Sequence, residues 1–427
     1  MKFILVLLDG LGDRSYASLG FKTPLQAART PNLDKLAVLG ANGLYHASFL
    51  GQNLPSESAH FLMFGYSLTG FPGRGLLEAV GEGIRFHDQD VILLAHLCNV
   101  NRKSGGLILK KGKDEVEGNK KEIGRLFKTL GPYEIDNIGF EILQKKRNDA
   151  LLILKGEVSP YISDSDPITL GLPMAKVVPL ENNPEPRNAA ITAKTINRYL
   201  SHCHQLLCHL QHHSDANFLA TRCASRRRAH TSFQHKWGLK GKIITSVSVL
   251  GGLAKELGMD FVKVKDSSDR SSDLKKRIRL ALDETHCDFI HVHTKVPDEA
   301  AHDDDPNLKR RQIERLDNGL GELLKTINKR DDILVAVTAD HSTLSQSTMV
   351  HSGEPLPVMF IGRTVRRDAV RHFDKSSAAT GGLGILKGSE ILHVANKYLN
   401  RRVFSGHRLG PKEVPFFPPP YEPFESD

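Results

Sequence analysis

The sequence has few cysteines, five in 427 residues, and they are odd in number and scattered. A disulfide framework needs paired cysteines, so this pattern argues against one and indicates a reducing compartment. No apolar run approaches the roughly 20 residues that a membrane-spanning helix requires. The N-terminal run Phe3–Leu8 is too short for a signal peptide and leads into Asp9-Gly10 without a small-residue cleavage site. We therefore expect a cytoplasmic protein.

The chain also lacks the motifs of nucleic-acid binding, although its formal net charge is +9 and its pI about 9.2. Zinc-finger spacing, RNA-recognition motifs and basic stretches interleaved with aromatic residues are all missing. We interpret the basic runs Arg226–Arg228 and Lys309–Arg311 as solvated helix faces. The positive charge suits a small anionic substrate, and neither nucleic acid nor a membrane is an expected partner. The sequence does not indicate an oligomeric state.

One local group of candidate zinc ligands contains Cys203, His204, Cys208, His209 and His213. These residues share one helix-like stretch and lack the paired C-x2-C and H-x3-H spacing of structural zinc sites. We therefore do not expect a metal ion there.

Buried strands and helices alternate along much of the chain. Apolar runs at Phe3–Leu8, Lys242–Leu250 and Ile333–Thr338 predict buried strands, while 272–282 and 312–325 have helical patterns. This alternation predicts an α/β fold with a doubly wound, mostly parallel sheet.

The sequence pattern changes between about Arg74 and Trp237. In this region glycines, charged helices and short predicted strands such as Gly106–Leu109 and Ala150–Leu154 alternate. We interpret this region as an inserted α+β domain. The predicted boundaries are 1–77 and 237–402 for a discontinuous core, 78–236 for the insertion, and 403–427 for a proline-rich tail.

The apolar run Ile333–Ala339 is followed directly by Asp340 and His341. His351 comes ten residues after His341. Open α/β sheets bind ligands at the carboxyl ends of their strands. Carboxylate oxygen and imidazole nitrogen are suitable donors for a divalent cation. Taken alone, the stretch is equally compatible with a polar turn.

Other segments of the chain supply further candidate metal ligands. Asp9 follows the first strand, and Asp298 and His302 are spaced i, i+4 after another strand, so both can grip one ion from a helical turn. Ser56 opens a helix, where a serine is most often a cap. As a nucleophile it would need activation by a base or a metal, because no G-x-S-x-G motif is present. Together these positions give seven potential ligands, enough for two ions.

These motifs give the chain a specific resemblance. It resembles the archaeal type of cofactor-independent, or 2,3-bisphosphoglycerate-independent, phosphoglycerate mutases in the alkaline phosphatase superfamily. The matching segments are LLDGLGDR at 7–14, TPLQAARTPNLDKLA at 23–37, PSESAHFLMFGY at 55–66, GRG at 73–75, SDSDP at 163–167, ANFLATR at 216–222, GLKG at 238–241, DFIHVHTKVPDEAAHDDD at 288–305, and TADHST and HSGEPLPV between 338 and 358.

The resemblance implies an alkaline-phosphatase-type sheet and a glycolytic isomerase that interconverts 3-phosphoglycerate and 2-phosphoglycerate through a phosphoserine at Ser56. It implies two divalent ions, with Mn²⁺ favoured and Mg²⁺ or Zn²⁺ as alternatives. One ion would lie among Asp9, Ser56, Asp340 and His341, and the other among Asp298, His302 and His351. The inserted domain would cover the site and exclude water.

The segments expected near the substrate depart from the family pattern, for example at Gly251-Gly252 and Asp266–Asp269. Arg74, Arg222 and Lys295 remain as candidates for phosphate or carboxylate contacts. The altered segments leave one alternative open, a phosphatase or a phosphotransferase acting on another small alcohol such as homoserine. A metal-binding regulatory protein without turnover is a third possibility.

Overall fold

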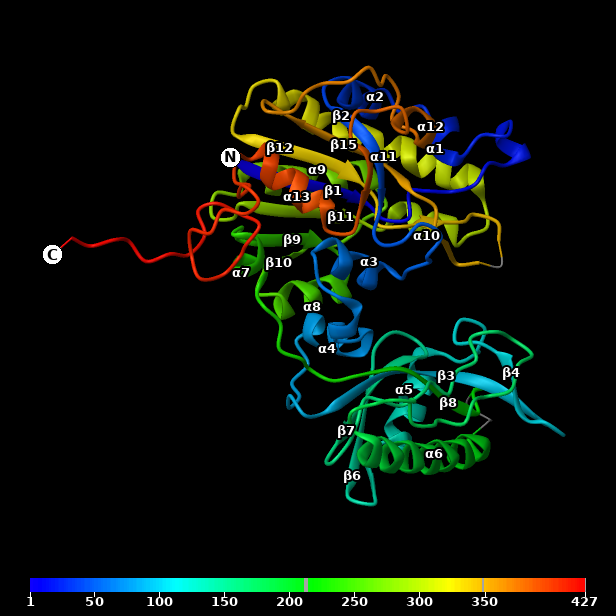
Figure 1. Cartoon of the computed structure of the whole chain (residues 1–427). Helices are drawn as coiled ribbons and strands as arrows, with labels where there is room; N and C mark the ends of the chain where they lie inside the picture. The colour runs from blue at the N-terminus through cyan, green and yellow to red at the C-terminus, as the bar shows by residue number, and fades with distance from the viewer. Residues whose placement is uncertain (211–213, 348, 427) are drawn as a thin grey trace. The chain divides into compact units, whose positions relative to one another are not determined.

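The computed structural model describes residues 1–210, 214–347 and 349–426, and the chain forms two compact units (Figure 1). The first unit comprises Met1–Phe71 together with His230–Asp427, and the second comprises Pro72–Ala229. The second unit is therefore inserted into the sequence of the first. It begins and ends a few residues before the boundaries 78 and 236 expected from composition.

An eight-stranded sheet runs through the described part of the first unit. Its strands are, in order across the sheet, β10 (Asp260–Lys263), β9 (Gly241–Thr245), β11 (Phe289–Thr294), β1 (Lys2–Leu8), β12 (Ile333–Thr338), β15 (Leu356–Gly362), β2 (Ala41–His46) and β16 (Gly384–Lys387). β15 is antiparallel to both its neighbours, and the other neighbouring strands are parallel. The structure therefore confirms the predicted mostly parallel α/β fold.

Helices connect these strands. They are α1 (Pro24–Ala27), α2 (Pro31–Val38), α3 (Ser56–Met63), α7 (Phe233–Trp237), α8 (Ser248–Glu256), α9 (Arg270–Asp283), α10 (Val296–Ala301), α11 (Pro306–Ile327), α12 (Lys375–Ala378) and α13 (Glu390–Tyr398). Among the residues that the structure describes, no helix of either unit is both long enough and apolar enough to cross a bilayer.

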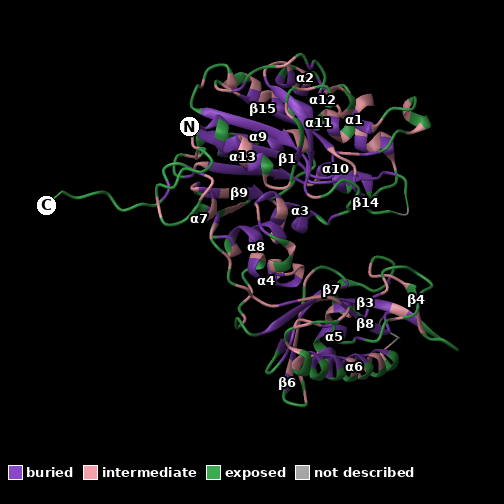
Figure 2. Cartoon of the chain, in the orientation of Figure 1, coloured by how far each residue is buried: buried purple, intermediate pink, exposed green. Residues whose placement is uncertain are grey.

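The central strand β1 is buried on both faces, as Figure 2 shows for most of the sheet. Ile4 belongs to a core with Ile278 of α9 and Leu320 of α11, whereas the ring of Phe3 packs 5.3 Å from that of Phe289. Side chains alternate across a strand, so burial on both faces requires an unbroken apolar run. The same requirement explains why β1 and β12 are recognisable in the sequence.

The strand predicted over 242–250 is wrong beyond Thr245, because α8 begins at Ser248. Val249, Leu250 and Leu253 are buried at i, i+1 and i+4, which is the spacing of one helix face. In a short apolar run, hydrophobic periodicity does not distinguish a buried strand from the buried helix that follows it.

The interpretation of the basic runs as solvated helix faces holds for Arg310 and Arg311 of α11, whose side chains are 29% and 48% exposed, but it is wrong for Lys309 and for 226–228. Lys309 lies in the first turn of α11, which begins six residues before the predicted start at 312, and its side chain is fully buried. Arg226–Arg228 follow a strand without forming a helix, and Arg226 and Arg227 pair with Glu185 and Asp88. A run of like charges does not reveal which of its members faces inward.

The second unit is an α+β structure built on an antiparallel sheet. Its elements are α4 (Arg74–Glu82), β3 (Val91–Lys103), β4 (Gly106–Lys111), α5 (Lys120–Leu130), β5 (Tyr133–Ile135), β6 (Ile138–Gln144), β7 (Asp149–Lys155), α6 (Pro186–His209) and β8 (Phe218–Ser225). β3 is central and pairs with β4, β7 and β8. The short strands predicted at 106–109 and 150–154 are confirmed as β4 and β7.

The C-terminal segment contacts the first unit through Phe416, which is 6% exposed and pairs by an isolated bridge with Arg402. Its ring lies directly over Gly238, where a Cβ atom would overlap it. Gly238 also has a φ of 67°, in the left-handed region that glycine adopts without a steric penalty.

We expect Gly238→Ala to destabilise the protein by about 1–3 kcal/mol more than Gly20→Ala, as measured by chemical denaturation. Gly20 has nearly the same φ, 65°, but a Cβ atom there would meet nothing within 4 Å. The control therefore carries the backbone strain without the collision with Phe416. Equal losses for the two variants would show that the ring does not rest on Gly238 in solution.

Candidate metal centre

The loops after three neighbouring parallel strands meet at one edge of the sheet of the first unit. Leu8 at the end of β1 is in register with Thr294 of β11, and Leu7 with Thr338 of β12. The residues that follow these strand ends therefore emerge side by side, although they are far apart in the sequence. Asp9, Lys295 and Asp340 are among them.

Asp9, Ser56, Asp340 and His341 form one buried group. Ser56 Oγ lies 2.9 Å from His341 Nε2 and 3.4 Å from Asp9 Oδ1. His341 Nε2 is 3.2 Å from Asp9 Oδ1 and 3.4 Å from Asp340 Oδ2. Ser56 is the first residue of α3 and follows the N-cap Pro55, so its hydroxyl is available to this group instead of capping the helix.

Asp298 is the centre of a second group. It lies in the first turn of α10, and its Oδ1 is 3.6 Å from His351 Nε2. Its Oδ2 is 3.5 Å from His302 Nε2 and 3.0 Å from Lys295 Nζ. Asp298 is buried, whereas the side chain of His302 is 48% exposed. The structure thus brings all seven sequence-predicted ligands into two adjacent groups.

The donor atoms in these groups fit a cation. The ligand atoms of Asp9, Asp340 and His341 lie within 4.8 Å of one another, and so do those of Asp298, His341 and His351. Asp340 Oδ2 is buried and has no hydrogen-bond donor among the described residues. A buried carboxylate oxygen that accepts no hydrogen bond is costly, and a bound cation would offset that cost.

The charges around Asp9 also favour a bound cation. Burial opposes ionisation of Asp9, yet Lys295 and a hydrogen bond from His293 hold the pKa of its carboxyl well below the usual range. Burial and the negative charge of Asp9 raise the pKa of Asp340. Burial also opposes the cationic form of His341, but the charges of Asp340 and Asp9 outweigh it and raise the pKa of the imidazole. The group concentrates negative charge that a divalent cation would neutralise.

Three buried histidines behind this group were not predicted as site residues. His293 donates from Nε2 to Asp9 Oδ2 at 3.0 Å, and its Nδ1 lies 2.9 Å from Thr245 Oγ1. His60 Nδ1 contacts the backbone oxygen of Ser56 at 2.7 Å, and its Nε2 lies 3.1 Å from His291 Nε2. Burial lowers the pKa of all three rings.

A sequence signal for these histidines does exist. His291 and His293 are two apart in a buried strand, hence on one face, and His60 is four residues after Ser56 in a helix. Polar residues that repeat with the period of a buried element need partners, and here the partners are Asp9 and the backbone of Ser56.

The candidate substrate contacts divide between the units. Lys295 Nζ lies 4.0 Å from Asp9 Oδ2 as well as close to Asp298, within the first unit. Arg74 and Arg222 belong to the second unit, where Arg74 Nε is 3.0 Å from Glu78 Oε1.

Arg222 lines a cavity of about 350 Å³ in the second unit, together with His96 and Lys113. Its Nε lies 3.3 Å from Asp166 Oδ2, which is also 3.6 Å from His96 Nε2. Asp166 belongs to the acidic segment SDSDP, so this segment supports an arginine at a cavity wall.

The cysteine and histidine residues near the end of α6 do not form a third ligand group. Cys203 is buried, and His204 Nδ1 contacts the backbone oxygen of Asn217 at 2.6 Å. His213 lies outside the described residues. Within the ranges that the structure describes, the groups of three or more candidate ligands are the two around Asp340 and Asp298.

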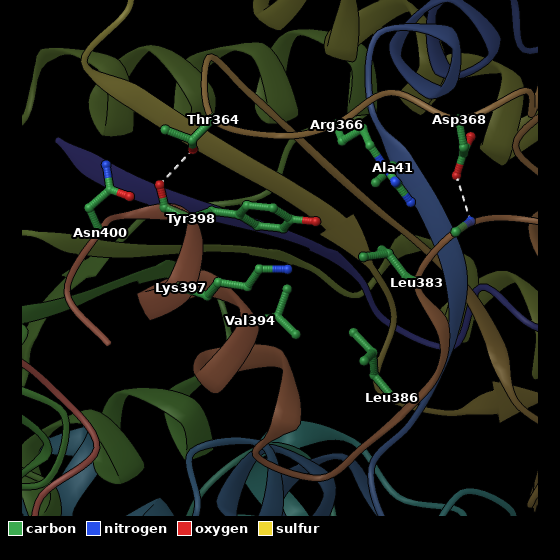
Figure 3. A pocket seen from close by; sticks show the side chains of 11 residues that line it. Ala41, Thr364, Arg366, Asp368, Leu383, Leu386, Val394, Lys397, Tyr398 and Asn400 are labelled. Atoms are coloured by element: carbon green, nitrogen blue, oxygen red, sulfur yellow. Dashed lines mark hydrogen bonds between the residues drawn. The ribbon is translucent and has the colours of Figure 1, made fainter. Parts of the chain in front are cut away.

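A separate cavity of about 690 Å³ lies between the start of β2 and the end of α13 (Figure 3). Arg366 and Lys397 line it together with the ring of Tyr398. Asp368 at its wall is engaged internally, since it accepts hydrogen bonds from the backbone of Asn42 and Gly382. None of the seven candidate metal ligands lines this cavity.

Comparison with known proteins gives full-length similarities. A family model described as the metalloenzyme superfamily matches residues 1–397. The chain is 39% identical to 2,3-bisphosphoglycerate-independent phosphoglycerate mutase 2 of Methanocaldococcus jannaschii, over 96% of each chain. It is 33% identical to the 2,3-bisphosphoglycerate-independent phosphoglycerate mutase of Methanopyrus kandleri, over 94% of this chain and 97% of that protein.

Solved structures agree in fold. A protein from Pyrococcus horikoshii is similar with a TM-score of 0.76 at 25% identity, over 95% of this chain and 99% of that chain. The cofactor-independent phosphoglycerate mutase of Thermoplasma acidophilum is similar with a TM-score of 0.62 at 29% identity, over 93% of this chain and 100% of that chain.

Proposed function

We infer that this chain, which belongs to the 2,3-bisphosphoglycerate-independent phosphoglycerate mutases of the metalloenzyme superfamily, interconverts 3-phosphoglycerate and 2-phosphoglycerate. Its substrate is a small phosphorylated sugar acid, and divalent metal is part of its chemistry. The full-length relatives favour this reaction over the phosphatase or homoserine-type phosphotransferase that the altered segments left open. The five free thiols support a cytoplasmic location as part of the same proposal.

The observation that carries the mechanism is the environment of Ser56 Oγ, which is buried between His341 and Asp9. In the proposed reaction Ser56 Oγ loses its proton and bonds to phosphorus while the bond from phosphorus to the C3 oxygen of glycerate breaks, and that oxygen gains a proton. The C2 hydroxyl then loses its proton and bonds to phosphorus while the bond from phosphorus to Ser56 Oγ breaks, and Ser56 regains a proton. Bound divalent cations would lower the pKa of the serine hydroxyl and neutralise phosphoryl oxygens.

We assign two divalent ions to the centre, with Mn²⁺ as the favoured metal and Mg²⁺ or Zn²⁺ as alternatives. Asp9, Ser56, Asp340 and His341 would hold one, and Asp298, His302 and His351 the other. The mixture of carboxylate oxygen and imidazole nitrogen supports a first-row transition-metal ion such as Mn²⁺. Ligand atoms of His341 lie within 4.8 Å of those of both groups, so its imidazole would be within reach of either ion.

Arg74, Arg222 and Lys295 are proposed to bind the anionic substrate. Lys295 has the clearest support, because the charges of Asp9 and Asp298 outweigh the opposing effect of burial and raise the pKa of its ammonium. A permanently charged ammonium beside the ligand groups can contact a phosphoryl oxygen.

Incubation of the purified chain with Mn²⁺ and 3-phosphoglycerate tests the proposal. We expect 2-phosphoglycerate to accumulate to equilibrium without release of inorganic phosphate, because the phosphoryl group returns from Ser56 to the same glycerate. A coupled enolase assay measures 2-phosphoglycerate, and a molybdate assay measures inorganic phosphate. Free phosphate without 2-phosphoglycerate would establish the phosphatase instead.

A further inference from the structure

Lys309 has a fully buried ammonium group in the first turn of α11. It donates to the backbone oxygens of Gly12 and Thr343, each at 2.7 Å, and to Asp13 Oδ2 at 3.2 Å. An ammonium has three donors, and here each donor has one acceptor. The group is therefore fully satisfied although no water-exposed surface remains.

The three acceptors lie in the two loops that carry proposed metal ligands. Gly12 and Asp13 follow Asp9, and Thr343 follows His341. These loops also touch directly, since Thr343 N donates to the Gly12 oxygen at 3.1 Å. Lys309 contacts none of the seven ligands, but it fastens the loop of Asp9 to the loop of His341.

Thr343 extends the connection to the second ligand group. Its hydroxyl donates to Asp298 Oδ1 at 2.6 Å and lies 3.2 Å from His341 Nδ1. The space around it is tight, because a Cβ atom at Gly10 would lie 2.6 Å from Thr343 Oγ1 and 2.7 Å from Asp298 Cβ. A shift of Thr343 would therefore move ligands of both groups.

Asp13 is held from its other side. Its Oδ1 accepts from the Tyr16 hydroxyl at 2.6 Å, and its Oδ2 accepts from Ser345 Oγ at 2.5 Å. Ser345 lies two residues beyond Thr343, so its hydrogen bond to Asp13 joins the same two loops a second time, beside the buried ion pair of Asp13 and Lys309.

A buried ion pair is a weak source of stability, since well-packed apolar residues often stabilise a protein as much. Here the ion pair of Asp13 and Lys309 matters because it fixes the positions of the two ligand loops. We propose that Lys309 is a positioning residue that fixes the separation of the two ligand loops and so preorganises the donor atoms for the cations. This inference rests on the proposed function, because it assumes that these loops bind metal.

The test compares Lys309→Met with Lys2→Met in the full chain. Lys2 is a matched control: it is also buried, and its ammonium donates to the backbone oxygens of Ala281, Leu282 and Glu284 at 2.6–2.9 Å. It lies at the amino end of β1, opposite the ligand loops. Both variants lose a buried lysine with three acceptors, so both are expected to lower the melting temperature.

We expect only Lys309→Met to weaken Mn²⁺ binding, by about 10–100-fold, as measured by electron paramagnetic resonance of free Mn²⁺. The Mn²⁺ concentration for half-maximal activity should rise by the same factor, and saturating Mn²⁺ should restore much of the activity. A merely structural lysine would lower the melting temperature and leave the Mn²⁺ dissociation constant unchanged.

Unchanged Mn²⁺ affinity in Lys309→Met would overturn the inference, as would equal weakening in Lys2→Met. If Lys309→Met does not fold, Asp13→Asn is the variant that tests the positioning role. It keeps the shape of the side chain and removes the charge that faces Lys309. Weaker Mn²⁺ binding by Asp13→Asn supports the positioning role, and wild-type affinity overturns it. Failure of the wild-type chain to bind Mn²⁺ would instead remove the proposed metal centre itself, and the inference with it.

Discussion

Ser56→Ala is expected to reduce mutase activity by at least about 10⁴-fold, because the phosphoryl group then has no oxygen on which to rest between its two positions. The substitution removes one buried hydroxyl at the start of α3 and leaves the helix and its N-cap Pro55 in place. The loss should therefore occur without loss of the fold. Activity is measured with the coupled assay, and the fold by circular dichroism.

Ser58→Ala provides the matched control for this variant. Ser58 is a buried serine in the same helical turn, and it is not among the residues proposed to bind metal or phosphate. We expect it to keep activity within a few-fold of the wild type. If Ser56→Ala retained full activity while Mn²⁺ still bound, the serine mechanism would be wrong. If neither the wild type nor Ser56→Ala turned over substrate while both bound Mn²⁺, a regulatory metal-binding protein would be the better description.

Removal of divalent metal is expected to abolish turnover, by about 10³-fold or more, and added Mn²⁺ to restore it. Asp9, Asp340 and Asp298 are all buried within the first unit, and a bound cation would offset the negative charge that they concentrate there. The measurement is activity after exhaustive chelation with EDTA and dialysis, followed by titration with Mn²⁺, Mg²⁺ and Zn²⁺. Activity that persists after chelation would exclude the two-ion mechanism.

The same titration should stabilise the folded state. Each ion at a free concentration one hundred times its dissociation constant adds about 2.7 kcal/mol to the free energy of unfolding. Thermal unfolding with and without Mn²⁺ measures this as a rise in melting temperature. Asp340→Asn should reduce the rise, because it removes one carboxylate from the group around Ser56. A rise of full size in that variant would show that Asp340 is not a ligand.

The sequence predicts those features that depend on one element at a time. Asp9 and Asp340 are identifiable because each ends an unbroken apolar run, and the carboxyl ends of parallel strands meet at one edge. Asp298 and His302 follow from helical spacing. The assignment of ligands to two ions came from the resemblance to a known family, and the structure adds that His341 lies within reach of both groups.

Features that depend on contacts between distant segments are not encoded in any local pattern. The burial of Lys309 could not be read from its basic run, because two of its three acceptors, Gly12 and Asp13, are some 300 residues away. His60 and His293 looked like ordinary members of a helix and a strand for the same reason. In each case the pattern shows that the element is buried, but only the fold shows what the polar atom meets there.

The position of β1 at the centre of the sheet has a consequence for synthesis. Phe3 pairs with Phe289 on one side and Leu334 on the other, so β1 leaves the ribosome well before either of its partner strands has been made. At 5–20 residues per second this interval is on the order of tens of seconds. The second unit draws every strand of its sheet from 72–229 and has no such delay. The apolar segment that presents Asp9 thus stays uncovered until both of its partner strands have been made, which makes it a segment that molecular chaperones would have to protect.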